Sequence, residues 1–198
     1  MSKIQWTDET WNPLRGCTKV SAGWNGTVRL VPEKLEEPLR WRKPRMVFVN
    51  SMSDLFHESV PFKYIAAVFG VMAASPEHTF QLLTKRPARM LKFFKWVGET
   101  HRLAGDSGWE RDLAAANRIL LQSAIALEPG GGIDRGRRVS ALLETNPGAW
   151  PLPNVWLGVS VEDQKTSEER IPLLLQCPAA VRWISAEPLL GPEWTGNE

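Results

Sequence analysis

The stretch Met46-Val47-Phe48-Val49-Asn50-Ser51-Met52-Ser53-Asp54 decides the fold class. Its first half is a short, β-branched apolar run that predicts a buried strand, and its second half is a polar loop. The same order of apolar run and polar loop recurs at Phe80–Thr84, Val155–Val159 and Val181–Ser185. Such apolar runs are typical of strands buried on both faces of a parallel sheet, although Gln81 and Arg182 interrupt two of them.

Helical patterns lie between these strands. Two apolar stripes have helical spacing, one following Pro61 and one following Pro87: Ile65, Val68, Phe69 and Met72, and then Met90, Leu91, Phe94 and Val97. Thr166 with Glu169 fits a capping box for a third helix, which Pro172 is predicted to shorten or kink. Alternation of strands and helices implies right-handed crossovers, so the predicted fold class is α/β with parallel strands.

The chain suits a single domain spanning residues 1–198, with 43% hydrophobic and 23% charged residues. The alternation of predicted strands and helices is interrupted at residues 98–153, and we interpret them as a helical insertion between two βα units. The Gly-rich stretch inside it, 130–138, follows a helix and lacks a Gly-Lys-Ser/Thr ending, which indicates a solvated loop rather than a phosphate loop. The proline-containing segment Gly23–Pro44 is predicted to run extended over the surface.

Composition excludes several classes of protein. A formal charge of +2 excludes a nucleic-acid binder that acts through bulk charge. The two cysteines exclude a disulfide framework, and they are too few for the three or four thiolates of an iron–sulfur cluster or a zinc ribbon. Neither a membrane span nor a signal peptide is visible in the sequence. We therefore expect a cytoplasmic protein with reduced cysteines.

Polar residues collect directly after each predicted strand, at the edge where parallel sheets form their sites. The candidates for a pocket there are Ser51, Asp54, His57, Lys85, Arg86, Glu162, Asp163 and Glu187. Helix capping is the alternative for Asp54, Thr84 and Asp163, because the same residue types cap helices. Glu187 has a solvated or capping alternative as well. Lys85 and Arg86 precede a predicted helix N-terminus, whose dipole opposes positive charge, so we expect an anion beside them.

Two further features have competing interpretations. His57 lies in the loop after the first predicted strand, where a structural or solvated role competes with general acid–base chemistry. The basic stretch Arg40-Trp41-Arg42-Lys43 fits a nucleic-acid patch, because arginine contacts phosphate and tryptophan stacks on unpaired bases. Its alternative is a solvated face anchored by one buried indole.

Several blocks of the chain, in order, resemble a phage- and prophage-associated family of unknown function, whose members are similar to distant radical SAM enzymes. The blocks are Ile4–Pro13 with Gly16–Ser21, Asn50–His57, Leu83–Pro87, Trp156–Gln164 and Ser185–Gly191. The resemblance implies a partial, incomplete (β/α) barrel whose first strand lies in the segment ending at Cys17. It also implies that intact relatives bind S-adenosylmethionine and a [4Fe–4S] cluster through three cysteines.

The sequence departs from that family in two places. Gly23 is followed by Trp24-Asn25-Gly26, whereas the family continues into its second and third cysteines, so Cys17 is the sole remaining cluster cysteine. Cys177 matches no position of the motif, and we interpret it as a small buried hydrophobe. The strands that follow the Glu187 block in the family are also absent. Without three thiolates the cluster has no stable site, and no cofactor is expected.

These observations leave three hypotheses. The first is a shortened phage-type protein that binds a protein or nucleic-acid partner in a bacterial host without catalysis, one version being an inhibitor of a host defence system. The partner would contact the Arg40–Lys43 patch or an exposed barrel edge. The second is an enzyme that retains S-adenosylmethionine binding or nucleic-acid modification, with Asp54, Lys85 and Glu162 among its binding residues. The third is a decayed relative without function.

Overall fold

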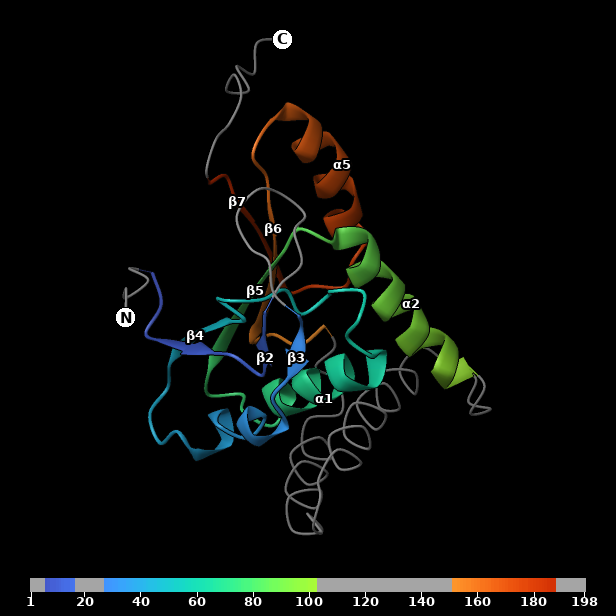
Figure 1. Cartoon of the computed structure of the whole chain (residues 1–198). Helices are drawn as coiled ribbons and strands as arrows, with labels where there is room; N and C mark the ends of the chain where they lie inside the picture. The colour runs from blue at the N-terminus through green and yellow to red at the C-terminus, as the bar shows by residue number, and fades with distance from the viewer. Residues whose placement is uncertain (1–5, 17–26, 103–150, 188–198) are drawn as a thin grey trace.

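The computed structural model describes residues 6–16, 27–102 and 151–187 (Figure 1). Five strands form one parallel sheet in the order β1-β4-β5-β6-β7. They are β1 (Glu9–Trp11), β4 (Met46–Val49), β5 (Thr79–Thr84), β6 (Val155–Ser160) and β7 (Val181–Ser185). The structure therefore confirms an α/β fold with parallel strands, and it confirms the four strands that apolar runs predict.

A strand also lies ahead of Cys17, where the family resemblance implies one. β1 pairs with β4 through Glu9–Val47, Thr10–Phe48 and Trp11–Val49. The small antiparallel pair of β2 (Leu14–Arg15) and β3 (Arg29–Leu30) follows it. The prediction that Gly23–Pro44 is extended is wrong over part of its described length. Two 3₁₀ turns form there, η1 (Pro32–Lys34) and η2 (Pro38–Arg40), each begun by a proline whose fixed φ suits the first helical position.

In the described residues three helices lie between the strands: α1 (Phe62–Ala73), α2 (Pro87–Arg102) and α5 (Gln164–Leu175). Pro61 and Pro87 stand at the starts of α1 and α2, as predicted. The capping box of α5 begins earlier than predicted, because Asp163 rather than Thr166 is the N-cap and Thr166 is its partner at the third helical position. Pro172 lies inside α5 without ending it. α2 continues past Gly98 to Arg102, and the rest of the predicted insertion up to residue 150 lies outside the described residues.

One hydrophobic core joins the helices to one face of the sheet. Alternate strand residues enter it, namely Trp11, Val47, Val49, Phe80, Leu82, Val155, Leu157 and Val159. They pack with residues of α1, α2 and α5, and Figure 1 shows these helices along one side of the sheet. Side chains alternate between the faces of a strand, so the intervening positions form a second surface. We call this surface the far face; it comprises Thr10, Met46, Phe48, Thr79, Gln81, Leu83, Trp156, Gly158, Ser160, Val181, Trp183 and Ser185.

None of the described helices is both long and apolar enough to cross a membrane.

Candidate functional site

Asp54 is the centre of a buried network at the carboxyl edge of the sheet. It lies in the loop after β4 and is 7% exposed. Its carboxylate accepts hydrogen bonds from Thr84 Oγ1 (2.8 Å), Lys85 N (3.2 Å) and Phe56 N (2.9 Å). Arg86 Nη1 lies 3.1 Å from Asp54 Oδ2. These donors offset the cost of removing the Asp54 carboxylate from water. The bonds also hold the loop after β4 against the loop after β5.

The anion that the sequence predicts at the start of α2 is therefore a side chain of the protein. The backbone N–H of Lys85 and the guanidinium of Arg86 both point at Asp54. Arg86 also pairs through Nε with Glu58 Oε2 at 3.1 Å. Because Arg86 is itself buried, its charge needs these carboxylates, and it is engaged in the structure by groups of the same chain.

A second cluster adjoins the first around Glu162, which follows β6 and is 4% exposed. Lys85 Nζ pairs with Glu162 Oε1, and Arg170 Nη1 of α5 lies 2.9 Å from Glu162 Oε2. Arg170 also donates to the carbonyl oxygen of Ser160 at 2.6 Å. Across both clusters the cations Lys85, Arg86 and Arg170 face the anions Asp54, Glu58 and Glu162. The charges of these six groups thus balance one another.

His57 lies beside the first cluster, in surroundings that disfavour its charged form. Its Nδ1 accepts a hydrogen bond from the Ser59 backbone N–H at 3.1 Å, and Ser59 Oγ is 2.9 Å away. Burial and then the positive charge of Arg86 lower the pKa of His57, against the opposing effect of Glu58 and Asp54. With Nδ1 engaged by its own loop, the geometry gives His57 a structural part in the turn after β4.

The remaining predicted site residues lie apart from these clusters. Ser51 donates to Asn12 Oδ1 at 3.2 Å. Asp163 caps α5, and hydrogen bonds from the Thr166 backbone and side chain lower the pKa of its carboxyl group. Glu187 is exposed just beyond β7. Cys17 lies outside the described residues.

Cys177 belongs to the hydrophobic core, as its interpretation as a small buried hydrophobe predicts. It is fully buried and its Sγ donates to the Leu173 carbonyl oxygen at 3.3 Å. Burial raises the pKa of the thiol to about 11, so the group is a neutral thiol near neutral pH. Metals bind the thiolate, and this cysteine therefore does not suit a ligand. In the described parts of the chain, no three His, Cys, Asp or Glu side chains are grouped as metal ligands would be.

The basic patch Arg40–Lys43 is anchored by its tryptophan. Trp41 is half-buried, its ring meets His78 edge-on at 5.5 Å, and Arg45 lies 5.3 Å from the ring centre. Arg40 pairs with Glu36 at 3.3 Å, whereas Arg42 and Lys43 are exposed. These contacts favour the solvated face anchored by one indole over a stacking platform, because the ring already packs against the protein.

The structure also reveals polar residues that sequence reasoning missed as site residues. Asn50, at the end of β4, and Gln81, in β5, are 4% and 6% exposed. Both Asn50 amide atoms, Gln81 Oε1 and Trp183 Nε1 are buried with no hydrogen-bond partner among the described residues. The signal for Gln81 was a polar residue interrupting an apolar run. Arg170 gave no signal, because its pairing with Glu162 depends on how α5 folds back on β6.

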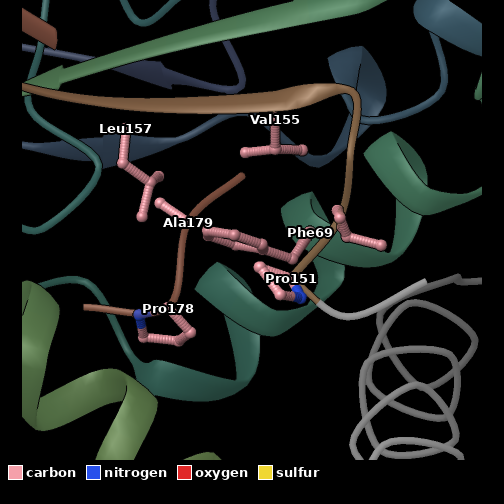
Figure 2. A pocket seen from close by; sticks show the side chains of 7 residues that line it. Phe69, Pro151, Val155, Leu157, Pro178 and Ala179 are labelled. Atoms are coloured by element: carbon pink, nitrogen blue, oxygen red, sulfur yellow. The ribbon is translucent and has the colours of Figure 1, made fainter. Parts of the chain in front are cut away.

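A small apolar cavity lies on the core face of the sheet, between β6 and α1 (Figure 2). Its volume is about 10 Å³, and it is lined by apolar side chains that include Phe69, Val155, Leu157 and Ala179. A space of this size holds one water at most, and the lining offers no polar partner. We therefore assign it to packing rather than to ligand binding.

The family model "Protein of unknown function (DUF5131)" matches residues 24–195. The chain belongs to this family. The matched region contains all of the charged edge, with Asp54, Arg86 and Glu162, and it begins after Cys17. Searches of curated proteins and of solved structures gave no match.

Proposed function

We propose that this chain is a non-catalytic binding protein built on a partial (β/α) barrel, related to radical SAM enzymes but without a competent iron–sulfur site. The observation that carries the proposal is the state of its cysteines. The chain contains two, and Cys177 is a buried thiol of the core whose Sγ is bonded to the Leu173 carbonyl oxygen. Cys17 alone does not hold a cluster, so the residues present do not fit the group.

The strand order supports a barrel-type arrangement. β1, β4, β5, β6 and β7 follow one another across the sheet in chain order, without a reversal. Right-handed crossovers then place every connecting helix on the same face, as in a (β/α) barrel, whereas a doubly wound sheet reverses direction and carries helices on both faces. β1 and β7 lie at opposite edges of the described sheet, which is why we call the barrel partial.

The charged edge supports binding rather than acid–base chemistry. In a catalytic pocket an acid or a base is kept available to a substrate. Here Asp54 is engaged by four donors and Glu162 by two cations. A closed network of this kind holds the loops after β4, β5 and β6 in one arrangement, and such rigidity suits a preformed binding surface.

More specifically, we propose that this binding protein inhibits a bacterial host system, the role that the resemblance to phage proteins suggests. Apolar side chains at the surface supply contact area for a partner. Trp6, Met52 and Ile184 are 45%, 49% and 46% exposed. Aromatic and apolar residues of this kind are the usual anchors of protein interfaces.

Anaerobic reconstitution with iron and sulfide tests the proposal. We expect no stoichiometric cluster by iron analysis or visible absorbance, in the native chain or in Cys17→Ala. A stoichiometric [4Fe–4S] signal that disappears in Cys17→Ala, and persists in the matched Cys177→Ala variant, overturns it. Calorimetry with S-adenosylmethionine gives a second reading, because heat of binding at millimolar ligand supports the enzyme hypothesis instead.

A further inference from the structure

The two edges of the parallel sheet differ in how they are protected from other chains. β1, at one end, has three residues and carries Glu9, whose side chain is 39% exposed and pairs with Arg45 Nη1 at 2.7 Å. A short, charged strand is one of the ways in which proteins prevent an edge from pairing with another chain. β7, at the other end, has five residues, and no strand in the described part of the chain pairs with its outer side.

β7 lacks the features that usually protect an edge strand. It contains neither lysine nor proline, and it pairs with β6 residue for residue from Val181 to Ser185, without a bulge. Its one charged side chain, Arg182, turns to the end of α5. There its Nε and Nη2 donate to the carbonyl oxygens of Leu174 at 3.3 Å and Cys177 at 2.7 Å. The charge is therefore engaged by the chain itself, and β7 remains open to association.

Apolar side chains of β7 are exposed on both faces of the sheet. Val181 is 36% exposed and Ile184 is 46% exposed. Because side chains alternate along a strand, Val181 lies on the far face and Ile184 on the opposite one. Six large apolar side chains are exposed among the described residues, and two of them belong to this five-residue strand. A strand added along β7 would thus cover apolar surface on both faces.

The backbone of β7 offers hydrogen bonds to such a strand. The carbonyl oxygen of Ser185 accepts a bond from the Val161 N–H at 2.9 Å, so the peptide groups of Ser185 face β6 and its loop. Successive residues of a strand direct their N–H and C=O groups to opposite edges, so Ile184 and Arg182 direct theirs outward. These two residues are the positions at which a further strand would bond.

We propose that β7 pairs with β7 of a second copy of this chain, about a two-fold axis beside Ile184. The same five residues supply an open edge and exposed apolar side chains, which makes the surface complementary to itself, as a two-fold interface requires. The axis makes the two strands antiparallel and joins the two sheets into one. This inference goes beyond the proposed function, because the occupant of the edge is the chain itself.

The charge of Arg182 decides the register of the pair. An axis at Arg182 would set two guanidinium groups opposite each other, which is unfavourable, and an axis at Trp183 would set Arg182 opposite Ile184. An axis at Ile184 sets two apolar side chains opposite each other and Arg182 opposite Ala186. Since the backbone groups of Ile184 point outward, the two copies of Ile184 exchange both hydrogen bonds, and their Cα atoms lie about 5.5 Å apart.

Sedimentation velocity of the full chain from about 1 to about 100 μM tests the proposal. We expect a species of twice the 22.3 kDa mass of the chain, in equilibrium with the monomer. Ile184→Lys sets two ammonium groups opposite each other at the axis, and we expect the dissociation constant to rise at least about ten-fold. The matched control Leu39→Lys places the same charge on an exposed apolar residue of η2 and leaves the constant unchanged. A monomer at every concentration, or equal constants for the two variants, overturns the proposal.

Disulfide formation in two cysteine variants tests the register without disrupting the pair. A Cα separation of about 5.5 Å suits a disulfide, so we expect Ile184→Cys to form a covalent dimer under mild oxidation. Val181→Cys is the control on the same strand, because its counterpart lies six positions along the pair, about 20 Å away. Covalent dimers in both variants to the same extent, or in neither, overturn the proposal. These outcomes are separate from the proposed function, which iron–sulfur reconstitution measures.

Discussion

Phe80 and Gln81 are neighbours on β5 but belong to opposite faces of the sheet. Phe80 is fully buried among the helices, and its ring packs on Trp11 at 5.8 Å. Gln81 is almost as buried, yet its Oε1 has no hydrogen-bond partner among the described residues. Burial of a side chain therefore affects stability differently on the two faces. The core face gains stability from apolar contact, whereas the far face keeps polar atoms unsatisfied at a cost in stability.

Substitution of these two neighbours gives the largest expected contrast. We expect Phe80→Ala to lower the free energy of unfolding by about 3–5 kcal/mol, because it leaves a cavity in the core. Gln81→Met is expected to change it by less than about 1 kcal/mol, because it removes an unsatisfied polar atom and keeps the volume. Urea denaturation followed by circular dichroism measures both. A loss in Gln81→Met as large as that in Phe80→Ala would mean that the far face is a second core.

The carboxyl edge of the sheet allows a second comparison. Two carboxylates there, Asp54 and Glu58, both pair with Arg86. The side chain of Asp54 is 9% exposed and that of Glu58 is 67% exposed. We expect Asp54→Ala to cost about 3 kcal/mol, because it strips a buried guanidinium of its partner. Glu58→Ala is expected to cost about 0–1 kcal/mol, the usual value for an exposed pair. Denaturation curves that give equal losses would show that Arg86 does not depend on Asp54.

Gly158 allows the far face to be changed without touching the core. Gly158→Ala places a methyl group against the Trp183 indole, and we expect a loss of about 1–3 kcal/mol from this overpacking. The double variant with Trp183→Leu is expected to recover most of the loss, because a shorter side chain leaves room for the methyl group. Failure of the double variant to recover stability would place the strain in the β6 backbone instead of the ring.

The elements that the sequence predicts are those determined by residues close together in the chain. β4, β5, β6 and β7 are apolar runs, and α1 and α2 have apolar stripes behind a proline, so periodicity alone identifies them. β1 is short and partly polar, with Glu9 and Thr10, and pattern analysis passes over it. The 3₁₀ turns at Pro32 and Pro38 have no period either. Their residues are ordered by contacts distant in sequence, such as the bond from Trp11 Nε1 to the Lys34 carbonyl oxygen at 2.7 Å.

The candidate site was predicted in its composition but not in its pairing. Placing Asp54, Lys85, Arg86 and Glu162 at one edge follows from parallel strands, whose carboxyl ends share an edge. Which cation meets which anion depends on loop conformation and on the position of Arg170 in α5, neither of which periodicity encodes. The surroundings of Gln81 required the sheet register, because only the register places it beside Phe48 of β4.

The smallest expected effect is a dependence of stability on pH through His57. Burial and the charge of Arg86 lower its pKa from the usual value near 6.5, so the folded state binds fewer protons than the unfolded state. The contribution of the neutral imidazole is therefore complete above about pH 6.5 and is lost as pH falls through the lowered pKa of the folded state.

His57→Asn provides the measurement, since the amide oxygen can accept the Ser59 N–H bond that Nδ1 accepts and does not titrate. We expect the free energy of unfolding to fall less steeply below pH 6.5 in His57→Asn than in the native chain. The groups around His57 are Arg86, Arg89, Glu58 and Asp54, and all of them are unchanged in the variant. Identical slopes in the two proteins would mean that folding leaves the pKa of His57 unshifted, and a steeper fall in His57→Asn would mean that Glu58, 4.0 Å from Nε2, raises that pKa.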